Sequence, residues 1–251
     1  MADIKEKVKN TKRHPWEVCR AKYILKIISE CGSISKIADI GAGDLFFSNF
    51  LVKNLTDVQI VAIDSSFETL DCENDRITKI RNVSELPKDE YDLIILMDVL
   101  EHVEHDYDFL NQIMSRILRT KKSYIIITVP AHQKLFSNLD RFLIHYRRYD
   151  YKTLEDVAKR AKLNIISIQY FFASLYLARM FLLRFDKPIE KQKVLGSWKF
   201  NTHNVITLLI IAFLSFDLWL GRVAHSLGLP WMGLSLFMLC ENNTAMSEDN
   251  V

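Results

Sequence analysis

The sequence predicts an α/β fold built on a mostly parallel sheet, and three observations lead to this prediction. Short runs rich in Ile, Val and Leu alternate along the chain with segments that have helical spacing. The first run, residues 37–40, leads directly into Gly41 and Gly43, as expected of a buried strand that ends in a tight turn. Polar residues follow several later runs, at the edge of such a sheet where ligands bind.

The composition is that of an ordinary globular protein. The chain has 251 residues, of which 49% are hydrophobic and 25% charged. The net charge of +2 gives no reason to expect bulk electrostatic binding to nucleic acid. The four cysteines form no C-x-x-C pair, which favours free thiols in a reducing compartment. Residues 1–10 are charged and lack the apolar stretch of a signal peptide, so we expect a cytoplasmic location.

Seven segments have the apolar, β-branched composition of strands, and they cover residues 37–40, 58–63, 77–81, 91–98, 124–129, 163–172 and 233–240. A helix is expected from Pro15 to about Gly32, with Pro in the first turn and Gly at the end. Further helices are expected over residues 45–52 and 109–118, and after Thr153, which we expect to cap its helix.

The glycine turn predicts a cofactor that contains a nucleoside. A dinucleotide-binding G-x-G-x-x-G motif needs a third glycine, but Phe46 occupies that position. Asp39 lies two residues before Gly41. Asp64 follows the second strand about twenty residues later, and its carboxylate can accept both hydroxyl groups of a ribose. Asp64 alone fits a nicotinamide dinucleotide and S-adenosylmethionine (SAM) equally well.

Three segments together resemble the Rossmann-like (class I) SAM-dependent methyltransferases. They read D-I-G-A-G at 39–43, V-A-I-D at 61–64 and Y-D-L-I-I-L-M-D-V-L-E-H-V at 91–103. The first resembles motif I of that family and the third closely resembles motif IV. The resemblance implies a seven-stranded sheet whose last strand is antiparallel, with SAM as cofactor. Leu45 departs from the pattern, because the family usually has a third glycine there.

The resemblance also implies roles for individual residues in the cofactor site. Asp39, Gly41 and Gly43 would hold the methionine end of SAM, and Asp64 would hold the ribose. The adenine would lie near the end of the third strand, and Asp98 would lie where the transferred methyl group sits. The resemblance therefore implies seven cofactor-binding residues: Asp39, Gly41, Gly43, Asp64, Asn82, Val83 and Asp98. Trp16 and Arg20 of the first helix are further candidates for the pocket.

The segment after the fifth strand, residues 129–149, collects polar and aromatic residues on the ligand side of the sheet, and we expect it to form a wall of the acceptor site. It resembles a V-P-A…D…G-H-x-R-R-Y signature of one methyltransferase subgroup, with Ile144 in place of the glycine. A hydroxyl acceptor needs a base. The candidates are His145, His102, Asp140 and Asp98, and His145 is preferred because it lies in the loop-like wall. The sequence shows no spacing typical of metal ligands, so no metal site is expected.

Residues 173–232 form an apolar insertion between the sixth and seventh strands. The run from Val205 to Phe216 is shorter than the ~20 residues of a spanning helix and is followed by Asp217, which argues against a transmembrane segment. A lid over the acceptor, a membrane-surface element and a dimer face all remain open. We therefore divide the chain into an N-terminal helical cap (1–35), a SAM-binding core (36–172), the insertion (173–232), and the last strand with a polar tail (233–251).

The sequence thus predicts a SAM-dependent methyltransferase that acts on oxygen of a small-molecule, sugar or lipid-linked acceptor. We expect it in the cytoplasm or at the inner face of a membrane, with a homodimer through the insertion as a further possibility. Two alternatives stay open. The first is a methyltransferase-like scaffold that works through the apolar insertion, since Leu45 could close the pocket. The second is a nicotinamide-dependent reductase on a similar sheet.

Overall fold

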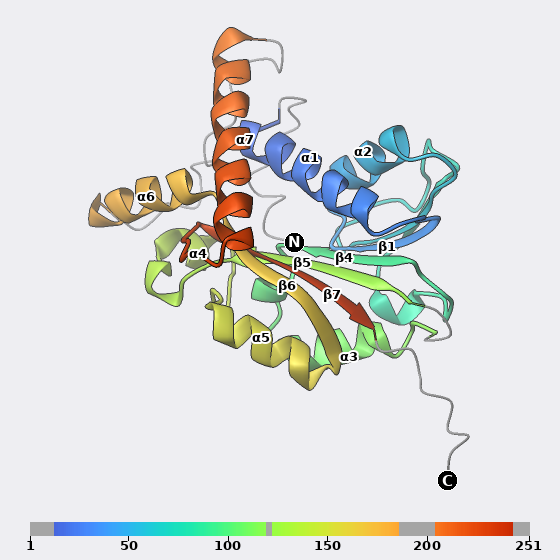
Figure 1. Cartoon of the computed structure of the whole chain (residues 1–251). Coiled ribbons are helices and arrows are strands. Elements are labelled where there is room, and N and C mark those ends of the chain that lie inside the picture. Colours follow the sequence, from blue (N-terminus) through green and yellow to red (C-terminus); the bar gives the residue numbers. More distant parts are fainter. Residues whose placement is uncertain (1–12, 119–121, 186–203, 243–251) are drawn as a thin grey trace.

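The computed structural model describes residues 13–118, 122–185 and 204–242. They form a single seven-stranded sheet in the order β3-β2-β1-β4-β5-β7-β6 (Figure 1). The strands are β1 (Lys36–Ile40), β2 (Gln59–Ile63), β3 (Ile77–Ile80), β4 (Leu93–Met97), β5 (Tyr124–Pro130), β6 (Leu163–Phe171) and β7 (Ser235–Asn242). β7 pairs antiparallel with both β5 and β6, and the pairs among β1 to β5 are parallel. The predicted fold class is confirmed.

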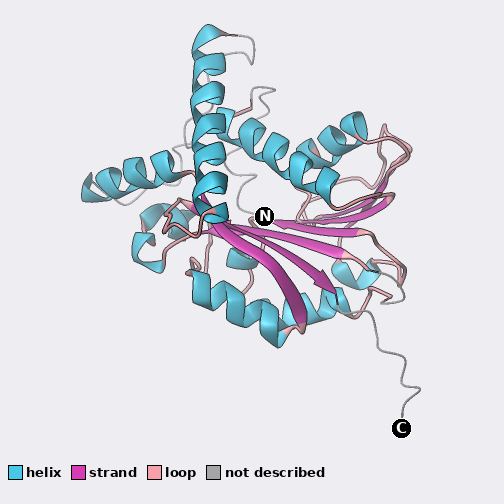
Figure 2. Ribbon diagram, in the orientation of Figure 1, coloured by secondary structure: helices cyan, strands magenta, loops and turns pink. Residues whose placement is uncertain are grey.

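Helices cover both faces of the sheet, as Figure 2 shows. The helices are α1 (Pro15–Glu30), α2 (Phe46–Asn54), α3 (Asp106–Met114), α4 (Asn138–Phe142), α5 (Tyr151–Arg160), α6 (Ala173–Leu182) and α7 (Val205–Ser226). α1, α2 and part of α7 share one buried cluster with the sheet, and α3 and α5 share the other. The central strand β4 has Leu93, Ile94, Ile95 and Leu96 fully buried, because both of its faces are covered.

Most predicted elements lie within a few residues of their expected positions. The cap of α5 was predicted wrongly: Asp150 is the N-cap, and Thr153 lies in the first turn with its hydroxyl bonded to the Asp150 backbone. α3 begins at Asp106, before the apolar run from which it was predicted. β5 continues through Pro130, since Ala131, just beyond it, donates to the Leu234 carbonyl.

α7 is longer than the apolar run that predicted it. Among the described residues it is the one helix long and apolar enough to cross a membrane by length and composition, and 28% of that stretch is buried. Its middle part packs on the domain through Leu214 and Leu218. Asp217 is buried there and accepts hydrogen bonds from Ser174 of α6, at 3.0 Å from the backbone N and 2.6 Å from Oγ. Asp217, which follows the apolar run in the sequence, therefore faces the protein interior and not the outer side of the helix.

Candidate active site

A cavity of about 460 Å³ opens at the carboxyl ends of β1, β2 and β4, which is large enough for a cofactor. This is the edge of an open parallel sheet where ligands bind. All the residues predicted from the sequence to bind the cofactor line it, namely Asp39, Gly41, Gly43, Asp64, Asn82, Val83 and Asp98. They come from four separate strand ends, so the topology of the sheet brings them together.

Gly41 is required by both conformation and space. Its φ is +76°, and a Cβ atom on it would lie 2.4 Å from Cγ2 of Val99. Its backbone N donates to the Ile63 carbonyl at 2.7 Å, which ties the turn to β2. Gly43 has a φ of +55° and donates its N–H to Oδ2 of Asp64 at 2.9 Å. The two glycines and Asp64 therefore form one connected turn around the cavity.

The two carboxylates of this turn have different environments. Asp39 is 2% exposed and accepts a hydrogen bond from the Ser48 hydroxyl at 2.5 Å. Burial raises the pKa of Asp39 to about 6, with the Ser48 hydrogen bond acting against burial and the charge of Asp64 adding to it. Asp64 also accepts from the backbone N and the hydroxyl of Ser66, at 2.8 and 2.5 Å. A cationic group in the cavity would favour the ionised form of Asp39.

Leu45 occupies a left-handed conformation, with a φ of +64°, at the start of α2. Ile144 does the same with a φ of +63°, where the subgroup signature has glycine. A left-handed conformation costs a non-glycine residue about 1–2 kcal/mol. Both residues thus adopt a backbone conformation that glycine takes more easily. Leu45 packs against the buried cluster beside α2 and does not line the cavity, so it leaves the pocket open.

α1 closes one side of the cavity through charged side chains. Arg20 forms an ion pair with Asp98, whose other oxygen accepts from the Thr128 hydroxyl at 3.2 Å. Arg13, which lies just before α1, forms a second ion pair, with Asp44 next to the glycine turn. Of the two candidates named from the sequence, Arg20 lines the cavity; Trp16 is not among its lining residues and lies under the Arg20 guanidinium. The Arg13 pair was not predicted, because its partner is distant in sequence.

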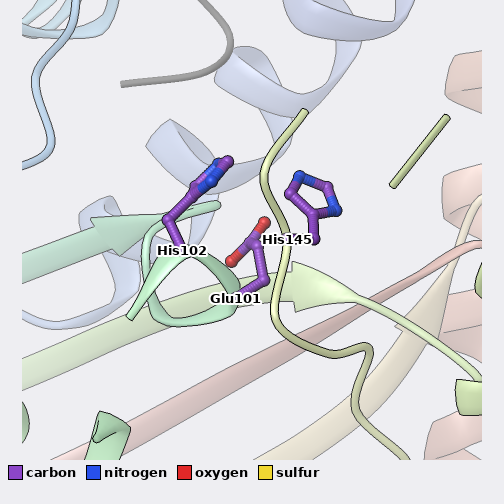
Figure 3. Close-up of side chains that lie close together, drawn as sticks. All are labelled: Glu101, His102 and His145. Atoms are coloured by element: carbon purple, nitrogen blue, oxygen red, sulfur yellow. The ribbon is translucent and has the colours of Figure 1, made fainter. Parts of the chain in front are cut away.

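Three of the four candidate bases, His102, His145 and Asp140, form a short chain of contacts that leads away from the cavity. His102 lines the cavity, and its ring lies 4.6 Å from that of His145 (Figure 3). Nδ1 of His145 lies 3.1 Å from Oδ1 of Asp140. Burial, together with the neighbouring His145, lowers the pKa of His102 to about 4. His102 is therefore a neutral imidazole at neutral pH, and of these three residues it is the one that lines the cavity.

Asp140 is fully buried at the centre of a charged network. It accepts from Nε of Arg148 at 2.7 Å, and an Arg179 nitrogen lies 3.5 Å from its second oxygen. Burial alone would raise the pKa of Asp140, but the hydrogen bond from His145, the charge of Arg148 and the Ser137 hydrogen bond together lower it to about 2. Arg179 belongs to α6, so this network joins the insertion to the wall of the site. Sequence reasoning missed the contact, since nothing local signals it.

Comparison with known proteins agrees with this geometry. A family model described as a methyltransferase domain matches residues 17–168. The chain belongs to this family. It is a class I SAM-dependent methyltransferase by fold and family, and its cofactor is SAM. Membership of this family selects SAM over the nicotinamide dinucleotide that was kept as an alternative.

Individual relatives cover different parts of the chain. A ubiquinone biosynthesis O-methyltransferase from Rickettsia bellii is 29% identical over 133 residues, which are 45% of this chain and 55% of that protein. The match thus spans just over half the length of this relative. A SAM-dependent methyltransferase from Archaeoglobus fulgidus has a TM-score of 0.53 at 14% identity, over 90% of this chain and 94% of that one. The plantazolicin methyltransferase BamL has a TM-score of 0.55 at 13% identity, over 89% and 85%. These two solved structures show the fold alone.

Proposed function

We propose that this methyltransferase transfers the methyl group of SAM to an oxygen atom of a small amphipathic or lipid-linked acceptor. The observation that carries the proposal is the position of His102, a neutral imidazole in the cavity wall at the end of the central strand. A neutral imidazole can take the proton of a hydroxyl group. The O-methyltransferase named among the relatives supports oxygen as the accepting atom.

In this proposal, different residues around the glycine turn bind different parts of the cofactor. The ionised Asp39 attracts the ammonium group of SAM, and the N–H groups of the glycine turn favour its carboxylate. Asp64 accepts from the ribose hydroxyls, and Asn82 and Val83 lie against the adenine. Asp98 and its partner Arg20 then border the reacting methyl group.

Methyl transfer would proceed as an in-line displacement. A lone pair of the acceptor oxygen forms the new bond to the methyl carbon, and the electron pair of the breaking S–C bond stays on sulfur, giving S-adenosylhomocysteine. The hydroxyl proton moves to His102. His145, held by Asp140, positions His102 from behind and does not reach the cavity itself. The donor is already activated, so positioning supplies most of the catalysis.

The amphipathic character of the acceptor is proposed from α6 and α7. Both helices expose large apolar side chains, among them Leu177, Phe181, Leu209, Phe213 and Phe216. We name these five the apolar helix surface. The sequence between the helices contains Lys187, Lys191, Lys193 and Lys199, although these lie outside the described residues. Exposed apolar side chains, with lysines in the intervening sequence, favour contact with an anionic membrane surface. The protein would then act at the inner face of a membrane.

Calorimetric titration with SAM and S-adenosylhomocysteine tests the cofactor part of the proposal. We expect micromolar binding, reduced at least tenfold by Asp64→Asn and unchanged by Asp71→Asn, which alters an exposed acid. Well-folded protein that binds neither compound would support the scaffold alternative.

Turnover tests the role of His102. With a panel of phenolic and lipid-linked hydroxyl acceptors, His102→Gln should lower the methyl-transfer rate by 10²-fold or more while cofactor binding persists. His105→Gln, which changes a nearby exposed histidine, should leave the rate unchanged. Equal rates in both variants would remove His102 from the mechanism.

Flotation with vesicles that contain anionic lipid tests the membrane part. The wild-type protein should float with the vesicles, and the double substitution Leu209→Lys with Phe213→Lys should stay in the soluble fraction. Thr207 and Leu214, on either side of this pair in the sequence, are buried and are left unchanged. If the wild-type protein stays behind and sediments as a dimer that the same variant dissociates, the apolar helix surface is a dimer face.

A further inference from the structure

Three potential metal ligands converge beside the cavity, from two separate segments of the chain. Glu101 and His102 belong to the short helical turn after β4, and His145 follows α4. Each offers one donor atom, and all three donor atoms lie within 4.8 Å of one another (Figure 3). Two imidazole nitrogens and one carboxylate oxygen are the protein ligands of several zinc sites and of non-haem iron(II) sites. We propose that Glu101, His102 and His145 bind one divalent transition-metal ion.

The groups behind the two imidazoles support this proposal. Oδ1 of Asp140 lies 3.1 Å from Nδ1 of His145. Because the carboxylate places the ring proton on Nδ1, Nε2 keeps its lone pair and can bind a metal. His102 makes a hydrogen bond to the backbone of Ile144, which leaves its other nitrogen available. Metal-binding histidines almost always have such a partner on the second nitrogen, which fixes the tautomer and the ring orientation.

The environment of the cluster favours a specific site over a loose surface contact. Glu101 is 1% exposed, and the His145 side chain is 8% exposed. Asp140 is itself held by Arg148, at 2.7 Å, and by the backbone N of Ser137, at 2.9 Å. The donor atoms around tetrahedral zinc lie about 3.3 Å apart, as follows from its bond lengths of about 2.0–2.2 Å to nitrogen and oxygen. Rotations that bring the donors together by about 1.5 Å at most would therefore complete the site.

The position of the cluster suggests what a bound metal would do. His102 lines the cavity, so an ion on its imidazole would lie at the cavity wall. With three protein ligands, the ion would keep a coordination position for an oxygen atom of the acceptor, and a metal polarises such an oxygen and lowers the pKa of its hydroxyl group. This role rests on the proposed O-methylation, and in the metal-bound protein it takes the place of proton transfer to His102, because the free nitrogen of His102 then binds the ion. Metal binding itself does not depend on the proposed function.

Cobalt(II) is a suitable probe, because its visible absorption reports the number and type of its ligands. The full chain is freed of metal with a chelator and titrated with Co²⁺, followed by absorbance and calorimetry. We expect one Co²⁺ per chain, with a dissociation constant in the micromolar range or below. Glu101→Gln and His145→Gln should each weaken binding at least tenfold, and Zn²⁺ should displace Co²⁺ from the wild-type protein.

The control variants are Glu104→Gln and His105→Gln, which change exposed neighbours of the same residue types. They should bind Co²⁺ like the wild type. S-adenosylhomocysteine binding is measured on every sample. If Glu101→Gln no longer binds S-adenosylhomocysteine because it is misfolded, the Co²⁺ affinity of His145→Gln is the result that tests the metal site. Wild-type protein that binds S-adenosylhomocysteine but no Co²⁺, or ligand variants with wild-type Co²⁺ affinity, would overturn the metal site. Wild-type protein that binds Co²⁺ but no S-adenosylhomocysteine would contradict the proposed function and leave the metal site standing.

Discussion

The cofactor cavity and the α6–α7 pair use buried acids in different ways. At the cavity, Asp39 and Asp64 sit at strand ends and line a space that a ligand can enter. In the helix pair, Asp217 joins α7 to Ser174 of α6, while large apolar side chains point outward. In the first region the acids border a cavity. The second leaves apolar surface exposed, and such surface usually marks an interaction site.

Asp140 lies where the two regions meet, and its replacement should have the largest effect. Asp140→Asn leaves the buried Arg148 without its carboxylate partner. Removing one member of a buried ion pair costs about 3–5 kcal/mol, so we expect that loss in the free energy of unfolding, measured with urea. Asp108→Asn, at an exposed position of α3, should change it by less than about 0.5 kcal/mol. Equal stability of the two variants would mean that the network contributes little.

Gly41→Ala should damage the cavity region and spare the helix pair. The new Cβ would collide with Val99 and hold the left-handed conformation at a cost of about 1–2 kcal/mol. We expect at least a thirtyfold loss of S-adenosylhomocysteine affinity, with vesicle binding intact. Gly228→Ala is the matched control, because its φ is +66° with no atom within 4 Å of the added Cβ. It carries the conformational cost alone, and its cofactor affinity should stay at the wild-type level.

The pH dependence of SAM binding should report on Asp39. Its pKa in the free protein is about 6, so the carboxylate is largely ionised at pH 7.5 and largely protonated at pH 5. An ammonium ligand needs the ionised form, and the dissociation constant should therefore rise about tenfold between these two values. Calorimetry at both values measures it. Asp39→Asn should bind weakly and lack this dependence; a wild-type profile that is flat would place the ammonium group elsewhere.

Stability and pH are linked at Asp39 with the opposite sign. Its pKa in the folded protein lies above the usual value of about 3.9 in an unfolded chain. The folded state therefore binds more protons between pH 6 and pH 4, and this one group makes the ligand-free protein more stable as the pH falls through that range. Thermal unfolding of the wild type and of Asp39→Asn, compared over that range, separates its contribution from the rest.

Asp217→Asn should weaken the joint between α6 and α7 and leave the cavity unchanged. One carboxylate oxygen accepts both hydrogen bonds from Ser174, and an amide oxygen would accept them without the charge. The expected loss is about 1 kcal/mol in the free energy of unfolding, with wild-type affinity for S-adenosylhomocysteine. Ser174→Ala in combination with it gives a double-mutant cycle. A large loss of cofactor affinity would show that the helix pair supports the cavity.

Leu45→Gly should have the smallest effect, and it should be stabilising. Glycine relieves the left-handed strain, gains flexibility in the unfolded chain and removes a side chain that packs beside α2. These terms nearly cancel, and we expect a net gain of about 0.5 kcal/mol with unchanged cofactor affinity. Ile144→Gly, at an exposed position, loses less packing and should gain slightly more. Denaturant unfolding measures both, and a loss of stability in both would contradict the strain argument.

Much of the fold and the cofactor pocket could be predicted because their signals are local. Apolar runs that end in glycine or an acid mark both a strand and the ligand edge of a parallel sheet, so residues such as Asp39 and Asp64 were found together. The wall of the site was harder. Arg179 reaches Ser137 and Asp140 across about forty positions of sequence, and no spacing rule reports such a contact. The positive φ of Leu45 was likewise hidden, because leucine gives no sign of it.

The length of α7 was underestimated for a related reason: the prediction stopped its apolar run at Asp217, which a partner in another helix accommodates. That partnership also restricts how the protein can meet a bilayer. Asp217 lies near the middle of α7, and an acid at the centre of a spanning helix costs about 2.5–3.5 kcal/mol on insertion scales. Spanning would add the loss of the Ser174 contacts to this cost. α7 therefore cannot both pack on its own domain and cross a membrane. The packed form would allow reversible attachment to a single leaflet, from which the protein can be released intact.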